Sequence, residues 1–335
     1  MSMERQQYCP TKIRTRLMVK SLFLLRIIFF LFAVVHVATG QDIPQALYGV
    51  YEQEADAKYS DEFNAKRDKN AFDSSKWHYR RTTKGRPGLG QGQEYVQEKN
   101  GKLICYGLKS TRKGGAIVSN RYFQYGFYAF KWRAKGMPHN KRNAWHPSVW
   151  GSFNDTKGSK VPSTSTRGDS WMEIDIMEFS TSSKTSTYWN TDAPAYIWVD
   201  TLMRRIKVNK GLGPKFGWKK AVMTDGIKDA FNGDIIGAKN HHKWKTLGME
   251  YHPEYLQLWQ KIGKKWHAIG HRIRLTSNNV KPSRKTVPRK AAKPLYWIIG
   301  NLFLPHGKTK IEEAQITNAK LELDWFRYHQ LTKNN

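Results

Sequence analysis

Short runs of apolar and aromatic residues recur along most of the chain, and Gly, Asn, Pro and Ser separate them. Runs of this length, rich in β-branched and aromatic residues, are typical of β-strands bounded by turns. Nine of them predict strands, at residues 102–108, 116–123, 125–135, 148–153, 171–179, 243–252, 255–263, 294–303 and 319–331. Strands at this spacing, without an internal repeat or a heptad pattern, predict an all-β antiparallel sandwich or barrel in one domain.

The stretch LELDWFRYHQ at 321–330 alternates between apolar and polar positions. A period of two places Leu321, Leu323 and Trp325 on one face of a strand and the even-numbered residues 322–326 on the other. Two other segments are irregular. Residues 41–60 are interpreted as a loosely tethered N-terminal segment, and residues 276–293, rich in Pro, Asn, Ser and basic side chains, as a long surface loop.

The first 40 residues have the composition of a targeting segment. Basic residues at positions 12, 14, 16 and 20 precede the apolar run IIFFLFAVVHVA at 27–38, and small residues follow it. This pattern predicts a secretory signal peptide over residues 1–40, cleaved after Gly40. The alternative is an uncleaved anchor, which the short run and the nearby Arg26 disfavour. We therefore expect a secreted or periplasmic protein that begins near Gln41 and does not contact the membrane after cleavage.

Basic residues outnumber acidic ones, with 57 Lys and Arg against 27 Asp and Glu. Six basic residues and one acid precede residue 41, so the remainder of the chain keeps a formal charge of +25. Such a charge attracts polyanions, whether nucleic acid, an anionic membrane or an acidic polysaccharide. Because export argues against nucleic acid, we expect a monomeric protein whose partner is an anionic polysaccharide.

Cys105 is the one cysteine that follows the first 40 residues, because Cys9 lies within them. No intrachain disulfide is then available, and the fold depends on its core. Within the apolar run LICYGL, Cys105 is predicted to be a buried small residue rather than a nucleophile or a metal ligand.

Three carboxylates are crowded into WMEIDIMEF at 171–179, in a chain that is otherwise strongly basic. On a regular strand Glu173 and Asp175 share a face, whereas Glu178 falls on the opposite face. A single β-bulge at Ile176 and Met177 restores the parity. The spacing thus predicts a bulged strand with all three acids on one surface.

Carboxylates gathered in this way suit the hydrolysis of a sugar chain. Two carboxyl groups about 5–5.5 Å apart cleave a glycosidic bond with retention of configuration, one as nucleophile and one as acid/base. A third acid between them raises the pKa of at least one neighbour by charge repulsion. A calcium site and a solvated strand face are the alternatives that these residues leave open.

The motif Glu173-Ile-Asp175-Ile-Met-Glu178 resembles the catalytic signature of glycoside hydrolase family 16, in the bulged E-x-D-x-x-E form of agarases, porphyranases, carrageenases and laminarinases. The resemblance covers most of residues 60–330. It includes DEFN at 61–64, FDSSKW at 72–77, AIVSNRYFQYGFYAFKWRAKG at 116–136, AWHPSVW at 144–150, KWKTLGMEYHPEYLQLW at 243–259 and LELDWFRYHQ at 321–330.

This resemblance implies a curved two-sheet β-jelly-roll sandwich of the concanavalin A-like kind, formed by residues 61–331 as a single catalytic domain. An open substrate groove is implied on the concave sheet. Carried onto this sequence, Glu173 is the nucleophile, Glu178 the acid/base and Asp175 the residue that tunes them in a double displacement. The chemistry requires no cofactor. Many relatives hold a structural calcium ion on the convex side, and Asp324 matches a position that often contributes to it.

The resemblance also implies substrate-binding residues near the strand of the cleft. Indole rings stack on the apolar faces of sugars, and Arg forks match sulfate esters. The alternative for each residue is a place in the core or on a surface unrelated to the substrate. The implied residues are Trp150, Trp145, Trp171, Arg133, Arg142 and His146.

The surplus of positive charge favours a sulfated galactan over a neutral glucan. We therefore expect an endo-acting, retaining hydrolase of β-linkages in porphyran, carrageenan or agar. A β-1,3-glucanase or a transglycosylase of the same family is one alternative, and a non-catalytic lectin for polyanionic glycans is another.

Overall fold

The computed structural model describes residues 42–64, 71–80, 88–137, 144–154, 171–178, 196–199, 219–222, 242–276, 286–289, 293–303 and 316–332. For residues 153–154, 171–173, 175, 178, 196–199, 219–222, 269–271 and 286–288 it describes the backbone alone. The chain divides into two compact units, residues 1–42 and 43–335, and every described strand belongs to the second unit. The predicted signal peptide and Arg142 lie outside the described residues. Within the described part, no helix has the length and apolar character needed to cross a membrane.

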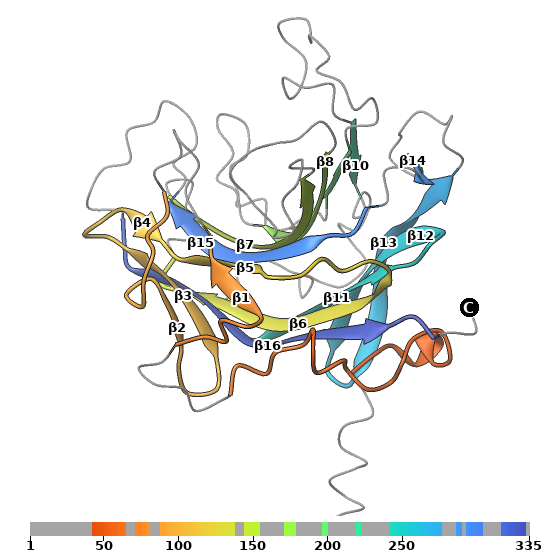
Figure 1. The fold of residues 1–335 in the computed structure, drawn as a ribbon, viewed down its shortest axis with the longest axis horizontal. Helices are drawn as coiled ribbons and strands as arrows, with labels where there is room; N and C mark the ends of the chain where they lie inside the picture. Colours follow the sequence, from red (N-terminus) through yellow and green to blue (C-terminus); the bar gives the residue numbers. More distant parts are fainter. Residues whose placement is uncertain are drawn as a thin grey trace, which may run out of the picture. The chain divides into compact units, whose positions relative to one another are not determined.

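Two β-sheets lie one above the other and curve in the same sense (Figure 1). The seven-stranded sheet contains, in spatial order, β1 (Trp77–Tyr79), β5 (Ala116–Ser119), β15 (Tyr296–Phe303), β7 (Trp145–Asn154), β8 (Trp171–Glu178), β9 (Tyr196–Val199) and β10 (Lys219–Val222). The nine-stranded sheet contains β14 (Thr286–Pro288), β13 (Lys265–Thr276), β12 (Tyr255–Ile262), β11 (Lys245–Tyr251), β6 (Gly126–Lys135), β16 (Ala319–Gln330), β3 (Leu103–Leu108) and β2 (Val96–Glu98), with β4 (Lys113–Gly114) paired to β3.

The all-β prediction is confirmed, because η1 (Gln45–Leu47), a single turn of 3-10 helix, is the one helix among the named elements of the described residues. Each of the nine predicted strands is present, and neighbouring strands pair antiparallel except β13 with β14. Strand β13 was not predicted, because its Lys, His and Arg residues obscure the apolar pattern. Strand β14 lies within the segment that was predicted to be a surface loop.

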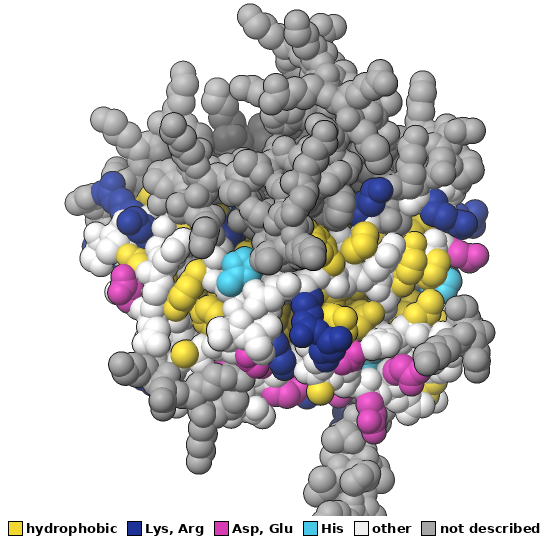
Figure 2. Space-filling view, in the orientation of Figure 1, with side chains coloured by type: hydrophobic (Ala, Val, Ile, Leu, Met, Phe, Trp, Pro, Cys, Tyr) yellow, Lys and Arg dark blue, Asp and Glu magenta, His cyan; other side chains and the backbone are white. Residues whose placement is uncertain are grey.

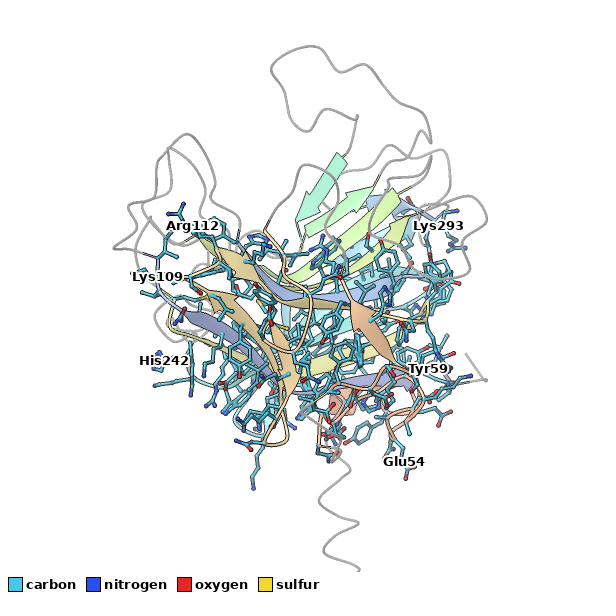
Figure 3. All side chains as sticks on the ribbon, turned by 60° about the vertical axis from the view of Figure 1, so that its left-hand side comes forward. Glu54, Tyr59, Lys109, Arg112, His242 and Lys293 are labelled. Atoms are coloured by element: carbon cyan, nitrogen blue, oxygen red, sulfur yellow. The ribbon has the colours of Figure 1, made fainter. Side chains whose placement is uncertain are left out.

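The core lies between the two sheets and is rich in aromatic rings (Figure 3). Alternation along β6 explains how it forms: Phe130, Trp132 and Ala134 are fully buried, whereas the residues between them are half-buried on the outer face. The rings of Tyr128 on β6 and Trp297 on β15 lie 4.9 Å apart and join the two layers. Cys105 is fully buried in this core, as predicted, and burial raises the pKa of its thiol.

Strand β16 corrects the predicted alternation at 321–330. The pairing of β16 with β6 shifts between Leu323 and Trp325, so that Asp324 is an extra residue in the strand. Leu321 and Leu323 face the core as expected, but beyond the bulge Phe326 faces the core and Trp325 does not. The prediction that Trp325 shares a face with Leu323 is therefore wrong.

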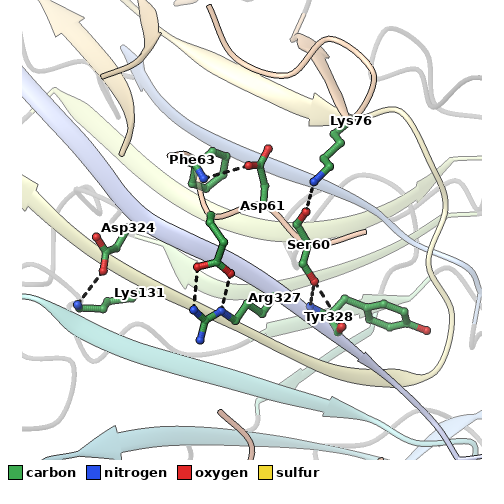
Figure 4. Close-up of polar contacts among 9 residues, drawn as sticks. Ser60, Asp61, Phe63, Lys76, Lys131, Asp324, Arg327 and Tyr328 are labelled. Carbon is green, nitrogen blue, oxygen red and sulfur yellow. Dashed lines mark hydrogen bonds and ion pairs between the residues drawn. The ribbon is translucent and has the colours of Figure 1, made fainter. Parts of the chain in front are cut away.

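The N-terminal segment is docked along β16 rather than loosely tethered, which corrects the prediction for residues 41–60. The backbone amides of Glu52, Asp56 and Asp61 donate to the carbonyls of Gln330, Tyr328 and Phe326 at 2.7–2.9 Å. The Arg327 guanidinium forms a bidentate ion pair with Glu62, with both distances 2.7 Å (Figure 4). Ile43, Leu47 and Tyr51 are buried against the outer face of the nine-stranded sheet.

A buried carboxylate holds this segment in place. Glu250 on β11 is fully buried and accepts hydrogen bonds from the Tyr51 hydroxyl at 3.4 Å, the Tyr255 hydroxyl at 2.5 Å and the Trp259 indole at 3.2 Å. The Arg272 guanidinium stacks on Tyr255 at 3.8 Å. Burial, followed by the nearby Glu250 charge, raises the pKa of Tyr51, so its phenol stays protonated and remains a donor.

Replacing this acceptor tests its contribution to stability. We expect Glu250→Ala to lower the free energy of unfolding by about 3 kcal/mol, because two buried donors, Tyr51 and Trp259, and the half-buried Tyr255 lose their acceptor. Glu250→Gln keeps one acceptor oxygen and should lose roughly half as much. Urea unfolding measures both, with the exposed Glu254→Ala as the control. A Glu250→Ala protein as stable as the control would contradict this role of Glu250.

Candidate active site

The central feature of the candidate site is the pairing of β8 with β7. Asp175 pairs with Trp150 and Met177 pairs with Val149, so the pairing passes over Ile176. The bulge that the sequence predicts at Ile176 and Met177 is therefore confirmed at the level of the backbone. On either side of it, Glu173 pairs with Ser152 and Glu178 with Ser148.

This register places the three acids on one face of the seven-stranded sheet. Their partners are residues 152, 150 and 148 of β7, whose own pairing with β15 is regular, so alternation gives these three partners a common face. Residues directly opposite each other on paired strands share a face. Positions 173, 175 and 178 therefore lie on the same face as Trp150.

The burial of β8 agrees with this assignment. Ile174, Ile176 and Met177 are fully buried and belong to the core between the sheets, as does Val149. Two consecutive core residues, Ile176 and Met177, mark the bulge, because a regular strand would send one of them outward. The three acid positions thus occupy the face that points away from the core.

Trp150 is the one large side chain among the three β7 partners of the acids, and the other two partners, Ser148 and Ser152, are each 1% exposed. Trp150 is half-buried and packs on a small cluster of Val118, Tyr296 and Ile298 on the outward face. A cross-strand row connects Asp175, Trp150, Ile298, Val118 and His78 through β8, β7, β15, β5 and β1. The predicted place of Trp150, beside the acids on the sheet, agrees with this row.

Arg80 was missed by the sequence analysis. Its guanidinium lies 5.0 Å from the centre of the Trp150 ring, a cation–π contact on the face that carries the acid positions. Tyr122 adds an edge-on contact to Tyr296 in the same cluster, with ring centres 5.8 Å apart. No sequence signal near HYRR distinguishes Arg80, because the order of the strands in the sheet brings it here.

Two other residues of β7, His146 and Trp145, lie on opposite faces of the sheet. His146 has the same parity as Trp150, so it lies on the face of the acid positions, where it is 7% exposed. Trp145 has the opposite parity and is 1% exposed in the core, where its indole donates to the Thr317 carbonyl at 2.8 Å. Trp145 is therefore a core residue in this structure and not a groove residue as the resemblance implied.

Arg133 is also placed away from the acids. It lies on β6 in the nine-stranded sheet, on the face that points away from the core, where it pairs with Glu322 and stacks on Trp244 at 4.3 Å. The expectation that it lies beside the cleft strand is corrected, because β6 and β7 are neighbours in sequence but belong to different sheets. The side chain of Trp171 and all of Arg142 lie outside the described residues.

The described partner of the Asp324 carboxylate is a lysine, and the implied calcium ion stays a prediction. This carboxylate forms an ion pair with the Lys131 ammonium at 2.7 Å (Figure 4). Calcium takes six to eight oxygen ligands, and one carboxylate shared with a lysine supplies few of them. In the described part of the chain, no group of three or more His, Cys, Asp or Glu residues is placed to hold a metal ion.

One pocket among the described side chains lies away from the strands of the candidate site. It has a volume of about 460 Å³ and is lined by Lys109, Ser110, Arg112, Ile316 and Asn318. Lys109 and Arg112 lie in the turn between β3 and β4 of the nine-stranded sheet (Figure 3). The open groove that the resemblance implies on the concave sheet stays a prediction, because the described residues do not outline it.

No model of a protein family matches the sequence, and no curated protein matches it. Several solved structures do resemble the fold. LamA from Zobellia galactanivorans, solved with laminaritriose and laminaritetraose, is 16% identical; the match covers 81% of this chain and 98% of LamA, with a TM-score of 0.52. A structure reported with the endo-acting O-glycanases by which human gut bacteria initiate mucin breakdown is 17% identical, covering 82% and 99%, with a TM-score of 0.52.

A third match is Rv0315 of Mycobacterium tuberculosis, described as an immunostimulatory antigen and pseudo β-1,3-glucanase. It is 15% identical over 82% of this chain and 98% of its own, with a TM-score of 0.51. At these identities the likeness shows the fold. The chain has the two-sheet jelly-roll found in enzymes of glycoside hydrolase family 16, as its sequence motifs implied.

A matched pair of deletions tests the register of β8. Deleting Ile176 removes the extra residue and leaves a regular strand in which positions 173, 175 and 178 keep their β7 partners. Deleting Ile174 instead moves Glu173 into the core-facing position next to Asp175, because Asp175 keeps Trp150 as its partner. Both deletions remove one fully buried isoleucine.

We expect the Ile174 deletion to be less stable than the Ile176 deletion by about 2–4 kcal/mol, because it buries a carboxylate without a partner. Denaturant unfolding measures the difference. Adding Glu173→Ala should restore much of the loss in the Ile174 deletion and little in the Ile176 deletion. Equal stabilities for the two deletions would show that the assigned face is wrong.

Proposed function

We propose that this protein is a secreted, endo-acting glycoside hydrolase that cleaves β-linkages in an anionic, sulfated galactan with retention of configuration. The single observation that carries the proposal is the bulged register of β8, which places Glu173, Asp175 and Glu178 on one outward sheet face beside Trp150. The fold supports it, because it is shared with enzymes that cleave polysaccharides within the chain. Fold alone does not fix activity, since one neighbour on it is named a pseudo-glucanase.

The proposed mechanism is a double displacement. Glu173 attacks the anomeric carbon while Glu178 donates a proton to the leaving oxygen, which forms a covalent glycosyl-enzyme and releases one end of the chain. Glu178 then removes a proton from water, and the water attacks the anomeric carbon and restores Glu173. Asp175 lies between them in the register and repels added negative charge, which favours a protonated neighbour.

The groups around the acids suit an anionic sugar chain. Trp150 offers a half-buried indole for a sugar ring, and the guanidinium over it is a donor that matches sulfate. The face drawn in Figure 2 shows basic and acidic side chains interspersed. The formal charge of +25 after residue 40 therefore acts as a diffuse field that favours encounter with a polyanion.

A β-1,3-glucanase is the second candidate, and one observation favours it. LamA, which shares the fold, was solved with laminaritriose and laminaritetraose. A neutral glucan has no charge for the basic surface to attract, so we place the sulfated galactan first. A transglycosylase would use the same three acids and would differ in its products.

A panel of purified polysaccharides decides between these substrates. We expect release of reducing ends from porphyran or κ-carrageenan, with long fragments appearing first because the cleavage is endo-acting. Activity on laminarin alone would overturn the galactan assignment. Proton NMR of the first products should show the same anomer as the substrate, because a double displacement inverts the carbon twice.

Glu173→Gln should lower kcat by roughly a thousandfold or more, because an amide cannot act as the nucleophile. Glu254→Gln removes a carboxylate from an exposed turn between β11 and β12 and is the matched control, with full activity expected. The Ile176 deletion should stay active and the Ile174 deletion should not. Hydrolysis by Glu173→Gln at the parent rate would exclude this residue as nucleophile.

Export of the protein has its own test. N-terminal sequencing of the protein recovered from the medium or periplasm should begin at Gln41, because the small residues before it suit cleavage after Gly40. A cell-associated protein that keeps residues 1–40 would contradict the proposed signal peptide.

A further inference from the structure

The outer face of the nine-stranded sheet carries a continuous row of aromatic and basic residues. Trp325 pairs with Lys131, Lys131 with Thr246, Thr246 with Lys261, and Lys261 with Trp266. We call these five residues the outer row. It crosses β16, β6, β11, β12 and β13 at one level, with a tryptophan at each end.

The outer row lies on the side of the sandwich opposite to the candidate active site. On β6 the neighbours of Lys131, Phe130 and Trp132, are fully buried in the core, so Lys131 faces outward from the nine-stranded sheet. The acid positions of β8 face outward from the seven-stranded sheet. The core separates the two faces, so a ligand on the outer row does not share the candidate site.

The three tryptophans around the outer row, Trp325, Trp266 and Trp244, are each half-buried and lie against a cation. Arg327 lies 4.4 Å from the Trp325 ring centre, and Lys261 lies 5.8 Å from that of Trp266. Trp244, which precedes β11, is contacted by Arg133 at 4.3 Å and by Lys131 at 5.4 Å. Next to them Lys320 lies 5.5 Å from the ring of Tyr106. Such pairs hold ring faces and positive charges side by side.

The N-terminal segment defines the border of this surface. It covers the sheet over Phe127, Ala129 and Trp259, and Trp325 and Trp266 pack against the edge of that covered cluster. Beyond the edge of this cluster, 35% of the Lys131 side chain is exposed to solvent. Within the described residues, the cover therefore ends at the outer row, where the lysines and tryptophans stay partly exposed and Thr246 between them is 9% exposed.

The balance of charge on this face is positive. Acidic residues partner some of the cations, as in the pairs of Lys131 with Asp324 and of Arg133 with Glu322. Among the residues around the outer row, the basic side chains outnumber the acids by six to three: Lys131, Arg133, Lys135, Lys261, Lys320 and Arg327 against Glu62, Glu322 and Asp324. The surface thus complements a negatively charged ligand that also has apolar faces.

We propose that the outer row is a second, non-catalytic binding surface for an anionic polysaccharide chain. Strands lie about 4.8 Å apart, so the row from Trp325 to Trp266 spans about 19 Å, enough for several sugar units laid across the strands. Tryptophan rings at the two ends stack on sugar rings, and the lysines between them meet the sulfate groups. The choice of a sulfated glycan rests on the proposed function, whereas the row itself does not.

Binding assays on an inactive protein test this surface. The full chain carrying Glu173→Gln is mixed with κ-carrageenan, with neutral agarose and with double-stranded DNA, and its affinity is measured. Trp325→Ala should weaken κ-carrageenan binding about fivefold through the lost ring contact. The double change Lys131→Gln and Lys261→Gln should weaken it about tenfold and flatten its dependence on salt.

The control is Lys58→Gln with Lys109→Gln, which removes the same charge from two exposed positions outside the row. We expect this control to bind like the parent. If Trp325→Ala fails to fold, the double change of Lys131 and Lys261 still tests the proposal, because it replaces two partly exposed side chains. If the double lysine variant and its control bind κ-carrageenan with equal affinity, the proposal is overturned. It is also overturned if the double lysine variant loses as much affinity for DNA as for κ-carrageenan, because the surface would then bind polyanions in general.

Hydrolysis is measured on the wild-type chain and binding on the Glu173→Gln chain, so a failure of the proposed function can be distinguished from a failure of the second binding surface. If the wild-type chain cleaves none of the sulfated galactans but the row variants still weaken κ-carrageenan binding, the proposed function fails and the second surface stands. If the wild-type chain cleaves a sulfated galactan and the row variants bind κ-carrageenan like the control, the second surface fails alone.

Discussion

Side chains along a β-strand alternate between two faces, and this constraint decides where the three acids of β8 lie. The segment has one residue between Glu173 and Asp175 but two between Asp175 and Glu178. A regular strand would turn Glu178 into the core, where an unpaired carboxylate is costly. The extra residue at Ile176 removes that conflict, because Ile176 and Met177 both enter the core. The packing of Ile176 and Met177 in the core therefore determines which face of the sheet carries the positions of the three acids.

The rest of the fold keeps this strand in register. Strand β8 is inside the seven-stranded sheet, between β7 and β9, and the bulge is confined to one step of its pairing with β7. Beneath it, the two sheets share a core of aromatic rings such as Tyr128 and Trp297. An aromatic core of this kind resists shifts of a strand, because each displaced ring would leave a void or a clash. Rigid strands suit a site whose groups must meet within a fraction of an ångström.

The sequence predicts the architecture well, because strand length, turn residues and alternation are local properties. It also predicts the bulge in β8, since three acids of one chemistry require a common face. It does not predict the bulge at Asp324. The apolar Trp325 fits a regular alternation with Leu321 and Leu323, so nothing in the pattern indicates that its ring lies on the outer face. Arg133 was assigned by its nearness in sequence to β7, but the chain changes sheets between them. Trp145 differs, since its odd spacing from Trp150 already indicates the opposite face.

The last strand of the chain, β16, lies inside the nine-stranded sheet between β6 and β3, and residues 51–61 then bond along it. Residues 51–61 can therefore pair only after the residues of β16, which lie at the other end of the sequence, have been made. Loop closure on this scale makes folding slow and prevents an incomplete chain from reaching the native state. Residues 51–61 therefore have no strand to pair with until the C-terminal residues are available.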